Sequence, residues 1–311
     1  MKCLITGGTG FIGSHIQDKL IGLGHEVAIV DSLRSSTTQF INPKSKFYQV
    51  DVRDSQISNI FNEFKPEAVF HLAAQNEVPY SMEHPNEDTD ININGMINIL
   101  NASKSVGVKK FVYSNTGGAY YGDVPETDLP ISEDHPVPFP TSFYGVSKAA
   151  GEQYLRLFGH VYSLPWVSLR YSNVYGPRQA GNREAGIVAI FTQKMIAGQV
   201  PTIFGDGLHT RDYVYVGDVV NANIAAMNYS QNDYFNISVA DRISNNQVFD
   251  TIEKYLKTGF KPVYGPDRPG DARHVSLDNS KAKKHLNWSP QVSFDDGVRQ
   301  TLEFYGSNVT G

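Results

Sequence analysis

The chain has 311 residues, a length that suits two domains or one large domain with an elaborated second lobe. Its 27 basic and 32 acidic residues give a net charge of −5 without a long basic run, which argues against a surface for nucleic acid or anionic membranes. The single cysteine, Cys3, excludes an intrachain disulfide and a cysteine-based metal site, and the nine histidines lack ligand-like spacing, so we expect no bound metal.

The chain begins with a short apolar segment that glycines follow closely. Residues 1–6 reach Gly7 too early to form the apolar region of a signal peptide, and no apolar stretch approaches membrane-spanning length. We therefore expect a cytoplasmic protein that does not bind a membrane.

Short apolar runs alternate with helical patterns in the first half of the chain. Strands are predicted at 3–6, 26–30, 46–50, 68–72, 110–113 and 166–170, and helices through Ile12, Ile16, Leu20 and Leu23 and through Ile93, Ile97 and Leu100. Alternation of helices with fully apolar strands indicates a parallel sheet that is covered by helices on both faces. The predicted fold class is therefore α/β, a Rossmann-type doubly wound parallel sheet.

Glycine and proline interrupt the pattern from about Gly176 onward. Helices are predicted around 216–227, 248–256 and 298–305, and residues 234–237 are expected to return to the main sheet as an extra strand. We expect this part to form a smaller mixed α/β substrate lobe over the carboxyl ends of the strands, where open α/β sheets bind ligands.

Gly7, Gly10 and Gly13 follow the first predicted strand and open the first predicted helix. Such glycines permit a tight turn, close approach of the backbone to a pyrophosphate and close packing of helix on strand. The helix N-terminus adds free N–H groups and a partial positive charge. Asp31 ends the second strand, where a carboxylate accepts hydrogen bonds from an adenosine ribose; this favours NAD over NADP, even with Arg34 nearby.

The chain has 17 tyrosines, and Tyr144 is the only one with a Lys four positions after it, Lys148. On a helix the two residues share one face, so the ammonium can lie beside the phenol. A nearby positive charge favours phenolate, and we expect it to lower the Tyr144 pKa toward neutrality. The alternative is a surface helix with an amphipathic Tyr and a solvated Lys, but the glycine loop on the same chain favours a catalytic pair.

Further motifs accompany these two features over essentially the whole chain: Asp51-Val52-Arg53, His71-Leu72-Ala73-Ala74-Gln75, Asn92 with Gly95, Arg170 to Pro177, Arg211 to Val216 and Arg268-Pro269-Gly270-Asp271. In this order the set resembles the extended short-chain dehydrogenase/reductase family, specifically its nucleotide-sugar epimerases and dehydratases. The resemblance implies an enzyme with NAD as cofactor and a UDP-sugar as substrate. It also implies a homodimer that forms through the helices after the fourth and fifth strands.

The resemblance assigns roles to individual residues. Tyr144 is implied to be the catalytic base, Lys148 to hold the nicotinamide ribose, and Thr116 to be the third catalytic residue, with Ser114 as the alternative. The implied cofactor-binding residues are Gly7, Gly10, Phe11, Ile12, Gly13, Asp31, Asp51, Val52, Leu72, Ala73, Ala74, Ser114, Tyr144, Lys148 and Tyr171. The implied substrate-binding residues are Thr116, Asn173, Val188, Arg211, Arg268, Asp271 and Val275.

The same resemblance divides the chain and narrows the reaction. An NAD-binding domain is expected at 1–176 together with 216–237, and a nucleotide-sugar-binding lobe at 177–215 and 238–311. Gly117 and Gly118 stand where related dehydratases carry an acidic pair, so dehydration is disfavoured. Val275 stands where some UDP-glucose 4-epimerases have a bulky Tyr, so room for an N-acetyl group is expected.

We therefore expect an epimerase that interconverts UDP-hexoses at C4 through a 4-keto intermediate. The alternatives within the family are a UDP-glucuronate 4-epimerase or decarboxylase, a dehydratase or a reductase. A non-catalytic dinucleotide sensor is the alternative from another class, because fold alone does not determine function.

Overall fold

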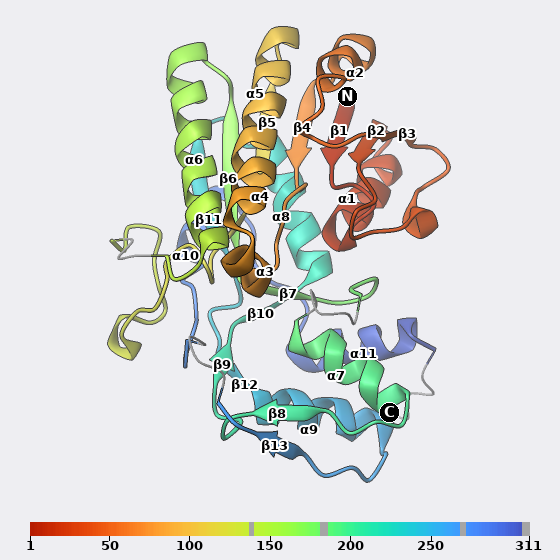
Figure 1. Ribbon diagram of the computed structural model, residues 1–311, viewed down its shortest axis with the longest axis vertical. Helices are drawn as coiled ribbons and strands as arrows, with labels where there is room; N and C mark the ends of the chain where they lie inside the picture. Colours follow the sequence, from red (N-terminus) through yellow and green to blue (C-terminus); the bar gives the residue numbers. More distant parts are fainter. Residues whose placement is uncertain (137–139, 181–185, 268–271, 307–311) are drawn as a thin grey trace.

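A seven-stranded parallel sheet forms one half of the molecule in the computed structural model, which describes residues 1–136, 140–180, 186–267 and 272–306 (Figure 1). The strand order is β11-β6-β5-β4-β1-β2-β3, and every neighbouring pair is parallel. The strands are β1 (Lys2–Thr6), β2 (Glu26–Asp31), β3 (Lys46–Gln49), β4 (Ala68–His71), β5 (Lys110–Thr116), β6 (Trp166–Tyr171) and β11 (Asp233–Ile237). The predicted doubly wound α/β fold is confirmed, including the late return of the chain to the sheet.

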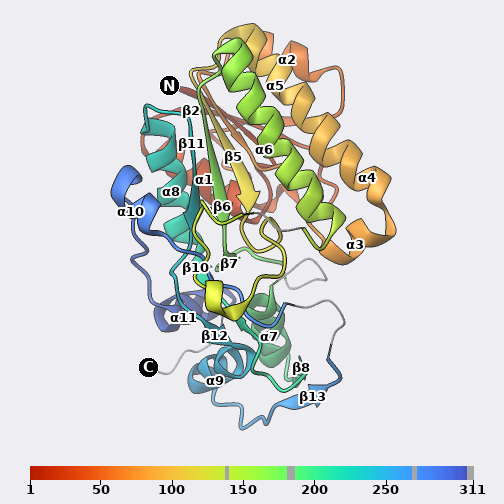
Figure 2. The same ribbon diagram turned by 90° about the vertical axis from the view of Figure 1, so that its left-hand side faces the viewer.

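Helices cover both faces of this sheet (Figure 2). One face packs on α1 (Phe11–Gly22), α8 (Val216–Asn228) and α10 (Ser280–Leu286), and the other on α2 (Ile57–Phe64), α5 (Gly95–Val106) and α6 (Phe143–Tyr162). The strand residues that these helices contact are aliphatic or aromatic and almost all fully buried. Strands that are buried on both faces explain why the sequence shows continuous apolar runs instead of alternation.

A helix with an irregular centre follows β4. The short helix α3 (Val78–Glu83) comes first and ends before His84. The backbone then stays helical from Pro85 to Val106, through α4 (Pro85–Thr89), a π-helical turn (Asp90–Asn94) and α5. Such π-helical turns are rare in proteins, and those that occur often lie at functional sites.

The second half of the chain builds a smaller lobe beyond the carboxyl ends of the strands (Figure 1). Its core joins α7 (Ile187–Ile196), α9 (Asn245–Leu256) and α11 (Phe294–Phe304). Short paired strands complete the lobe: β7 (Asn173–Tyr175) with β10 (Tyr213–Tyr215), β8 (Thr202–Phe204) with β13 (Val263–Gly265), and β9 (Thr210–Arg211) with β12 (Ile243–Ser244).

Asp212 joins the lobe to the sheet. Its buried carboxylate accepts hydrogen bonds from the backbone N–H groups of Val239, Ala240 and Leu277 at 2.9, 3.1 and 3.2 Å. Val239 and Ala240 follow β11, and Leu277 precedes α10. The Asp212 side chain therefore connects its own segment to two others. None of the helices in the described ranges is long and apolar enough to cross a membrane.

Candidate active site

A cavity of about 740 Å³ lies at the carboxyl ends of the strands, where α/β sheets bind their ligands. All fifteen residues expected to bind the cofactor line it. They are Gly7, Gly10, Phe11, Ile12, Gly13, Asp31, Asp51, Val52, Leu72, Ala73, Ala74, Ser114, Tyr144, Lys148 and Tyr171. The structure therefore brings together residues from β2, β5, β6, α1 and α6 with residues of the segments that follow β1, β3 and β4.

The glycine loop fits a dinucleotide because two of its glycines leave no room for a side chain. Gly7 has φ +70°, and a Cβ there would lie 2.8 Å from the backbone nitrogen of Ala73; a Cβ on Gly13 would collide with the Gly7 carbonyl. The N-cap of α1, Gly10, has no side-chain capping bond. The first N–H groups of α1 therefore remain available for a phosphate at the cavity wall.

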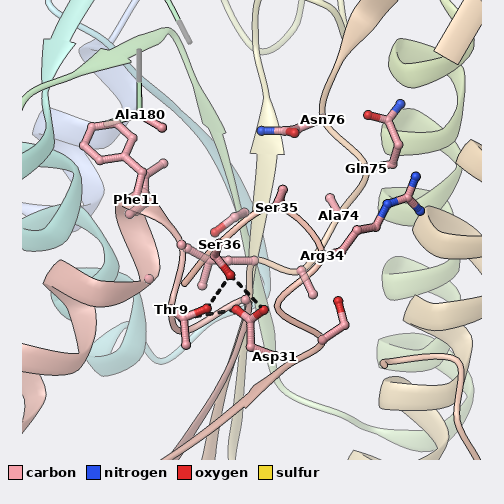
Figure 3. Close-up of a pocket in the computed structure, with 18 of the residues that line it drawn as sticks. Thr9, Phe11, Asp31, Arg34, Ser35, Ser36, Ala74, Gln75, Asn76 and Ala180 are labelled. Carbon is pink, nitrogen blue, oxygen red and sulfur yellow. Dashed lines mark hydrogen bonds between the residues drawn. The ribbon is translucent and has the colours of Figure 1, made fainter. Parts of the chain in front are cut away.

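Asp31 holds the glycine loop and the segment after β2 together (Figure 3). Its carboxylate accepts hydrogen bonds from the backbone N–H of Thr9 at 3.1 Å, from that of Leu33 at 2.9 Å and from the Ser36 hydroxyl at 3.1 Å. Arg34 donates instead to Glu87 at 2.5 Å and to the Tyr80 hydroxyl at 3.2 Å. The guanidinium that could bind a 2′-phosphate is thus engaged elsewhere, which agrees with NAD.

Tyr144 and Lys148 lie in the first turns of α6. Ser142 caps this helix by accepting a hydrogen bond from the Gly145 N–H at 3.1 Å. The Lys148 ammonium is buried, donates to the Ser114 carbonyl at 2.7 Å and lies 4.2 Å from the centre of the Tyr113 ring. The Thr116 side chain lowers the Tyr144 pKa, which places Thr116 near the Tyr144 hydroxyl. Tyr144 and Lys148 line the cavity, and Thr116 lies beside them at the end of β5.

The electrostatics differ from the expectation for Tyr144. Burial of the hydroxyl outweighs the Thr116 hydrogen bond and raises the Tyr144 pKa to about 12, and burial lowers the Lys148 pKa to about 7. The expectation that Lys148 lowers the Tyr144 pKa is therefore wrong for the protein without a bound ligand. Loss of water disfavours both the Tyr144 phenolate and the Lys148 ammonium.

Gly117 and Gly118 differ in their surroundings. A Cβ on Gly117 would collide with Leu277 and lie 3.1 Å from the Tyr171 carbonyl, whereas a Cβ on Gly118 would meet open space. Leu277 therefore occupies the space that a hydroxyl-bearing side chain at 117 would need. The Ser114 hydroxyl is paired with the Tyr171 hydroxyl at 2.9 Å, which leaves Thr116 as the hydroxyl beside Tyr144.

The expected substrate-binding residues differ in their exposure and surroundings. Arg211 and Asn173 are partly exposed near the junction of lobe and sheet, and Arg211 donates to the Thr210 carbonyl at 2.9 Å. Val188 and Val275 are 1% and 7% exposed; Val188 packs in the core of the lobe, and Val275 donates its N–H to the Thr210 carbonyl. Arg268 and Asp271 lie outside the described residues.

Three features of the site were not predicted. Gln75 and Asn92 form a buried hydrogen-bonded group with Asp88, and Asn223 donates to the Tyr171 hydroxyl at 2.9 Å. Arg178 and Gln179 line the cavity from the lobe side. Gln75 and Asn92 belong to recognised motifs, but nothing in the sequence around Asp88 or Asn223 distinguishes them from ordinary helical residues.

Comparison with known proteins agrees with this geometry. Residues 3–238 match the model of the NAD dependent epimerase/dehydratase family. The chain is 42% identical over 305 residues to a putative UDP-glucose 4-epimerase of Methanocaldococcus jannaschii, with 98% of both chains covered.

Solved structures show the same similarity. A UDP-glucose 4-epimerase of Thermotoga maritima with UDP-glucose matches with a TM-score of 0.96 and 45% identity over 98% of both chains. The Thermus thermophilus UDP-glucose 4-epimerase in complex with NAD matches with a TM-score of 0.92 and 40% identity over 99% of this chain and 100% of that one. A UDP-N-acetylglucosamine 4-epimerase of Methanobrevibacter ruminantium in complex with UDP-N-acetylmuramic acid has a TM-score of 0.92 and 32% identity, with 98% and 97% covered. The chain therefore belongs to the NAD-dependent epimerase/dehydratase family, within the extended short-chain dehydrogenases/reductases.

Proposed function

We propose that this enzyme interconverts UDP-glucose and UDP-galactose by inverting C4 of the sugar. The observation that carries the proposal is the pair of Tyr144 and the buried Lys148 in the cavity wall, next to Gly117 and Gly118 where no acidic side chain is present. Epimerisation at C4 needs one group that takes up and returns a proton, whereas elimination of water needs a further acid–base pair.

The roles of the three side chains follow from their positions. Tyr144 exchanges a proton with the sugar O4, and Thr116 donates a hydrogen bond to the same oxygen. Lys148 orients the nicotinamide ribose with its ammonium. Bound in the cavity, NAD would supply the hydride acceptor and donor that inversion at C4 needs. Burial raises the Tyr144 pKa to about 12 in the protein alone, and a positive charge beside the phenol would lower it.

The substrate nucleotide is proposed to bind between the sheet and the lobe. Arg211 and Asn173 would contact the diphosphate, with Arg211 as a charge-assisted donor. Arg268 and Asp271 are proposed to hold the phosphate and the nucleotide ribose, and Val188 to line the base pocket from α7. This assignment divides the molecule into an NAD-binding domain, 1–176 with 216–237, and a nucleotide-sugar-binding lobe, 177–215 with 238–311.

A second candidate substrate pair is UDP-N-acetylglucosamine and UDP-N-acetylgalactosamine. The observation in its favour is Val275, a small side chain fixed by its N–H···O bond to Thr210. A Tyr at this position would narrow the space for the C2 substituent. We expect Val275→Tyr to slow turnover of the N-acetylated pair at least about 10-fold more than turnover of UDP-glucose, because an added aromatic ring excludes the larger group.

We also propose that two copies associate through α6. Its outer face carries exposed apolar residues on successive turns: Phe143, Val146, Tyr154, Leu157 and Val161. Contiguous apolar surface of this kind marks a contact surface between proteins.

The proposal is tested by incubating the purified protein with UDP-glucose, UDP-N-acetylglucosamine or UDP-glucuronate without added NAD and following the sugar anomeric protons by NMR. We expect the UDP-galactose signal to appear from UDP-glucose, and Tyr144→Phe to lower kcat about 10²- to 10⁴-fold. Near-wild-type activity of Tyr144→Phe would contradict the proposal. Turnover of UDP-glucuronate alone, or release of CO₂ from it, would assign a different substrate or reaction.

A further inference from the structure

Asp88 is a fully buried carboxylate that the residues assigned so far do not explain. It lies on α4, immediately before the π-helical turn Asp90–Asn94, and has 0% relative exposure. Its neighbours in the chain, Glu87 and Asp90, are at the surface. A buried carboxylate costs free energy unless hydrogen bonds or an opposite charge compensate it, so its surroundings should reveal that compensation.

The hydrogen bonds of Asp88 are one-sided. Its Oδ1 accepts from Gln75 Nε2 at 3.0 Å and from Asn92 Nδ2 at 3.1 Å. Its Oδ2 is buried and has no hydrogen-bond partner in the described part of the chain. The Ser147 hydroxyl donates to the Tyr144 carbonyl at 3.0 Å and accepts from Asn92 at 3.0 Å. Burial raises the Asp88 pKa, and the nearby Ser147 and Gln75 side chains lower it. The groups that face the Asp88 carboxylate directly in the described part of the chain are therefore neutral.

Lys148 is a buried cation that also has few hydrogen-bond partners. Its ammonium, on a residue only 4% exposed, has three protons and donates one hydrogen bond, to the Ser114 carbonyl. Within the described residues no carboxylate forms a direct ion pair with it. The Asn92–Ser147 hydrogen bond connects Asp88 to the residue next to Lys148, and α4 packs against α6. A buried anion and a buried cation thus lie on neighbouring helices, and neither has another charged partner.

We propose that Asp88 is a positioning residue that supplies the counter-charge for Lys148 and keeps its ammonium protonated while Lys148 holds the nicotinamide ribose. This inference rests on the proposed function, because it assigns Asp88 to the same catalytic group. In the low dielectric of the interior the attraction between the two charges persists without direct contact.

The other titratable groups near Asp88 are tyrosines. Tyr144 on α6 and Tyr113 on β5 each have a pKa that burial raises first and Asp88 raises further. Asp88 attraction opposes the burial that lowers the Lys148 pKa, and Lys148 in turn lowers the Asp88 pKa, which burial raises. Glu87 on α4 is directed to Arg34 and Tyr80 at the surface. Among the described residues, Lys148 is the cation that acts on Asp88.

The test measures Lys148 directly and needs no activity. Protein labelled with ¹³C at lysine Cε is titrated by NMR, and Lys148 is assigned from the signal that Lys148→Met removes. We expect a wild-type midpoint near pH 7 and a midpoint about one pH unit lower in Asp88→Asn. Asp90→Asn removes the same charge from an exposed carboxylate paired with Arg53, and we expect no shift in that control. Equal midpoints in wild type and Asp88→Asn would overturn the inference.

A stability cycle provides the second readout. We expect Asp88→Asn to lower the urea midpoint of unfolding in the wild-type background, where it removes the partner of a buried ammonium. In Lys148→Met we expect the same change to leave the midpoint unchanged or raise it, because it removes an uncompensated charge. Equal losses in both backgrounds, or failure of Asp88→Asn to fold in both, would overturn the inference. Neither readout requires epimerase activity, so a failure of the proposed function is recognised separately.

Discussion

The hydroxyl of Thr116 is the only one that the structure brings to Tyr144 from the end of β5. Leu277 fills the space beside Gly117, and Ser114 is committed to Tyr171. Thr116 Oγ1 also accepts a hydrogen bond from the Ala119 N–H at 3.2 Å, which fixes its rotamer. A hydroxyl that is held in this way can donate to a substrate oxygen with little loss of conformational entropy.

This placement predicts the effects of three substitutions. We expect Thr116→Ala to lower kcat about 100-fold with little change in KM, because it removes a hydrogen bond to the oxygen on which charge develops. Thr116→Ser should retain most of the activity, and Ser114→Ala should lower kcat less than about 10-fold. Steady-state kinetics of the three variants with UDP-glucose test this order. A larger loss in Ser114→Ala than in Thr116→Ala would make Ser114 the catalytic hydroxyl.

The sequence predicted the residues of this site better than their chemistry. The spacing of Tyr144 and Lys148 on a helix follows from local sequence, whereas Thr116 came from the family resemblance. The Tyr144 pKa depends on how much water the folded chain excludes and on where the Lys148 ammonium points, and neither is encoded locally. Asp88 was missed for the same reason, since its burial results from the packing of α4 on α6.

The helix α6 is anchored to the sheet by a buried ion pair one turn beyond Lys148. Glu152 and Arg170 are 0% and 3% exposed, and Arg170 donates to both carboxylate oxygens, from Nε at 3.0 Å and from Nη2 at 2.5 Å. Asn115 and Ser168 also donate to Glu152, at 3.0 and 2.8 Å. The pair therefore fixes α6, with its Tyr144 and Lys148, against β5 and β6.

Breaking this pair should be costly. We expect Arg170→Met to lower the free energy of unfolding by about 3–5 kcal/mol, since it leaves Glu152 charged and buried without its partner. The double variant Glu152→Gln/Arg170→Met should lose less than the sum of the single losses. Arg242→Met, which breaks the exposed pair with Glu126, serves as the control and should cost less than about 1 kcal/mol. Urea unfolding of the four variants measures these differences, and equal effects at the two arginines would contradict the argument.

Elements were predicted to different degrees along the chain. The strands of the sheet and the helices α1, α8, α9 and α11 were found within a few residues, because apolar runs and helical spacing are strong there. The sequence indicated that β5 ends at Tyr113, but the strand continues to Thr116, because the polar residues 114–116 pair with β6. The π-helical turn was not predicted, because a single wider turn leaves no mark on helical periodicity.

At the scale of the whole molecule, α6 lies beside α5 on the outside of the sheet (Figure 2). Leu157 and Val161, each 55% exposed, are one turn apart on this face. Burial of such side chains against a second copy would add about 25 cal/mol for each Å² of apolar surface removed from water. This is the physical basis for the proposed homodimer.

Charged substitutions on this face should produce monomers. We expect wild-type protein to sediment with twice the chain mass and Leu157→Asp/Val161→Asp with the chain mass, because each carboxylate would be desolvated at the interface. Leu208→Asp changes an equally exposed leucine, 53% exposed, in the lobe and should leave the dimer intact. Sedimentation velocity distinguishes these outcomes, and a monomeric wild type would contradict the proposal.

The order of the strands also has a consequence for synthesis of the chain. β6 is translated long before β11, the strand that covers its edge, and the core beneath these strands is completed only by Leu286 and Trp288, after the lobe has been translated. A nascent chain that has emerged only as far as β6 therefore exposes an unpaired strand edge and apolar surface. The sheet therefore reaches its native state only after β11 and α10 have emerged, and its open edge and apolar surface are prone to aggregation until then.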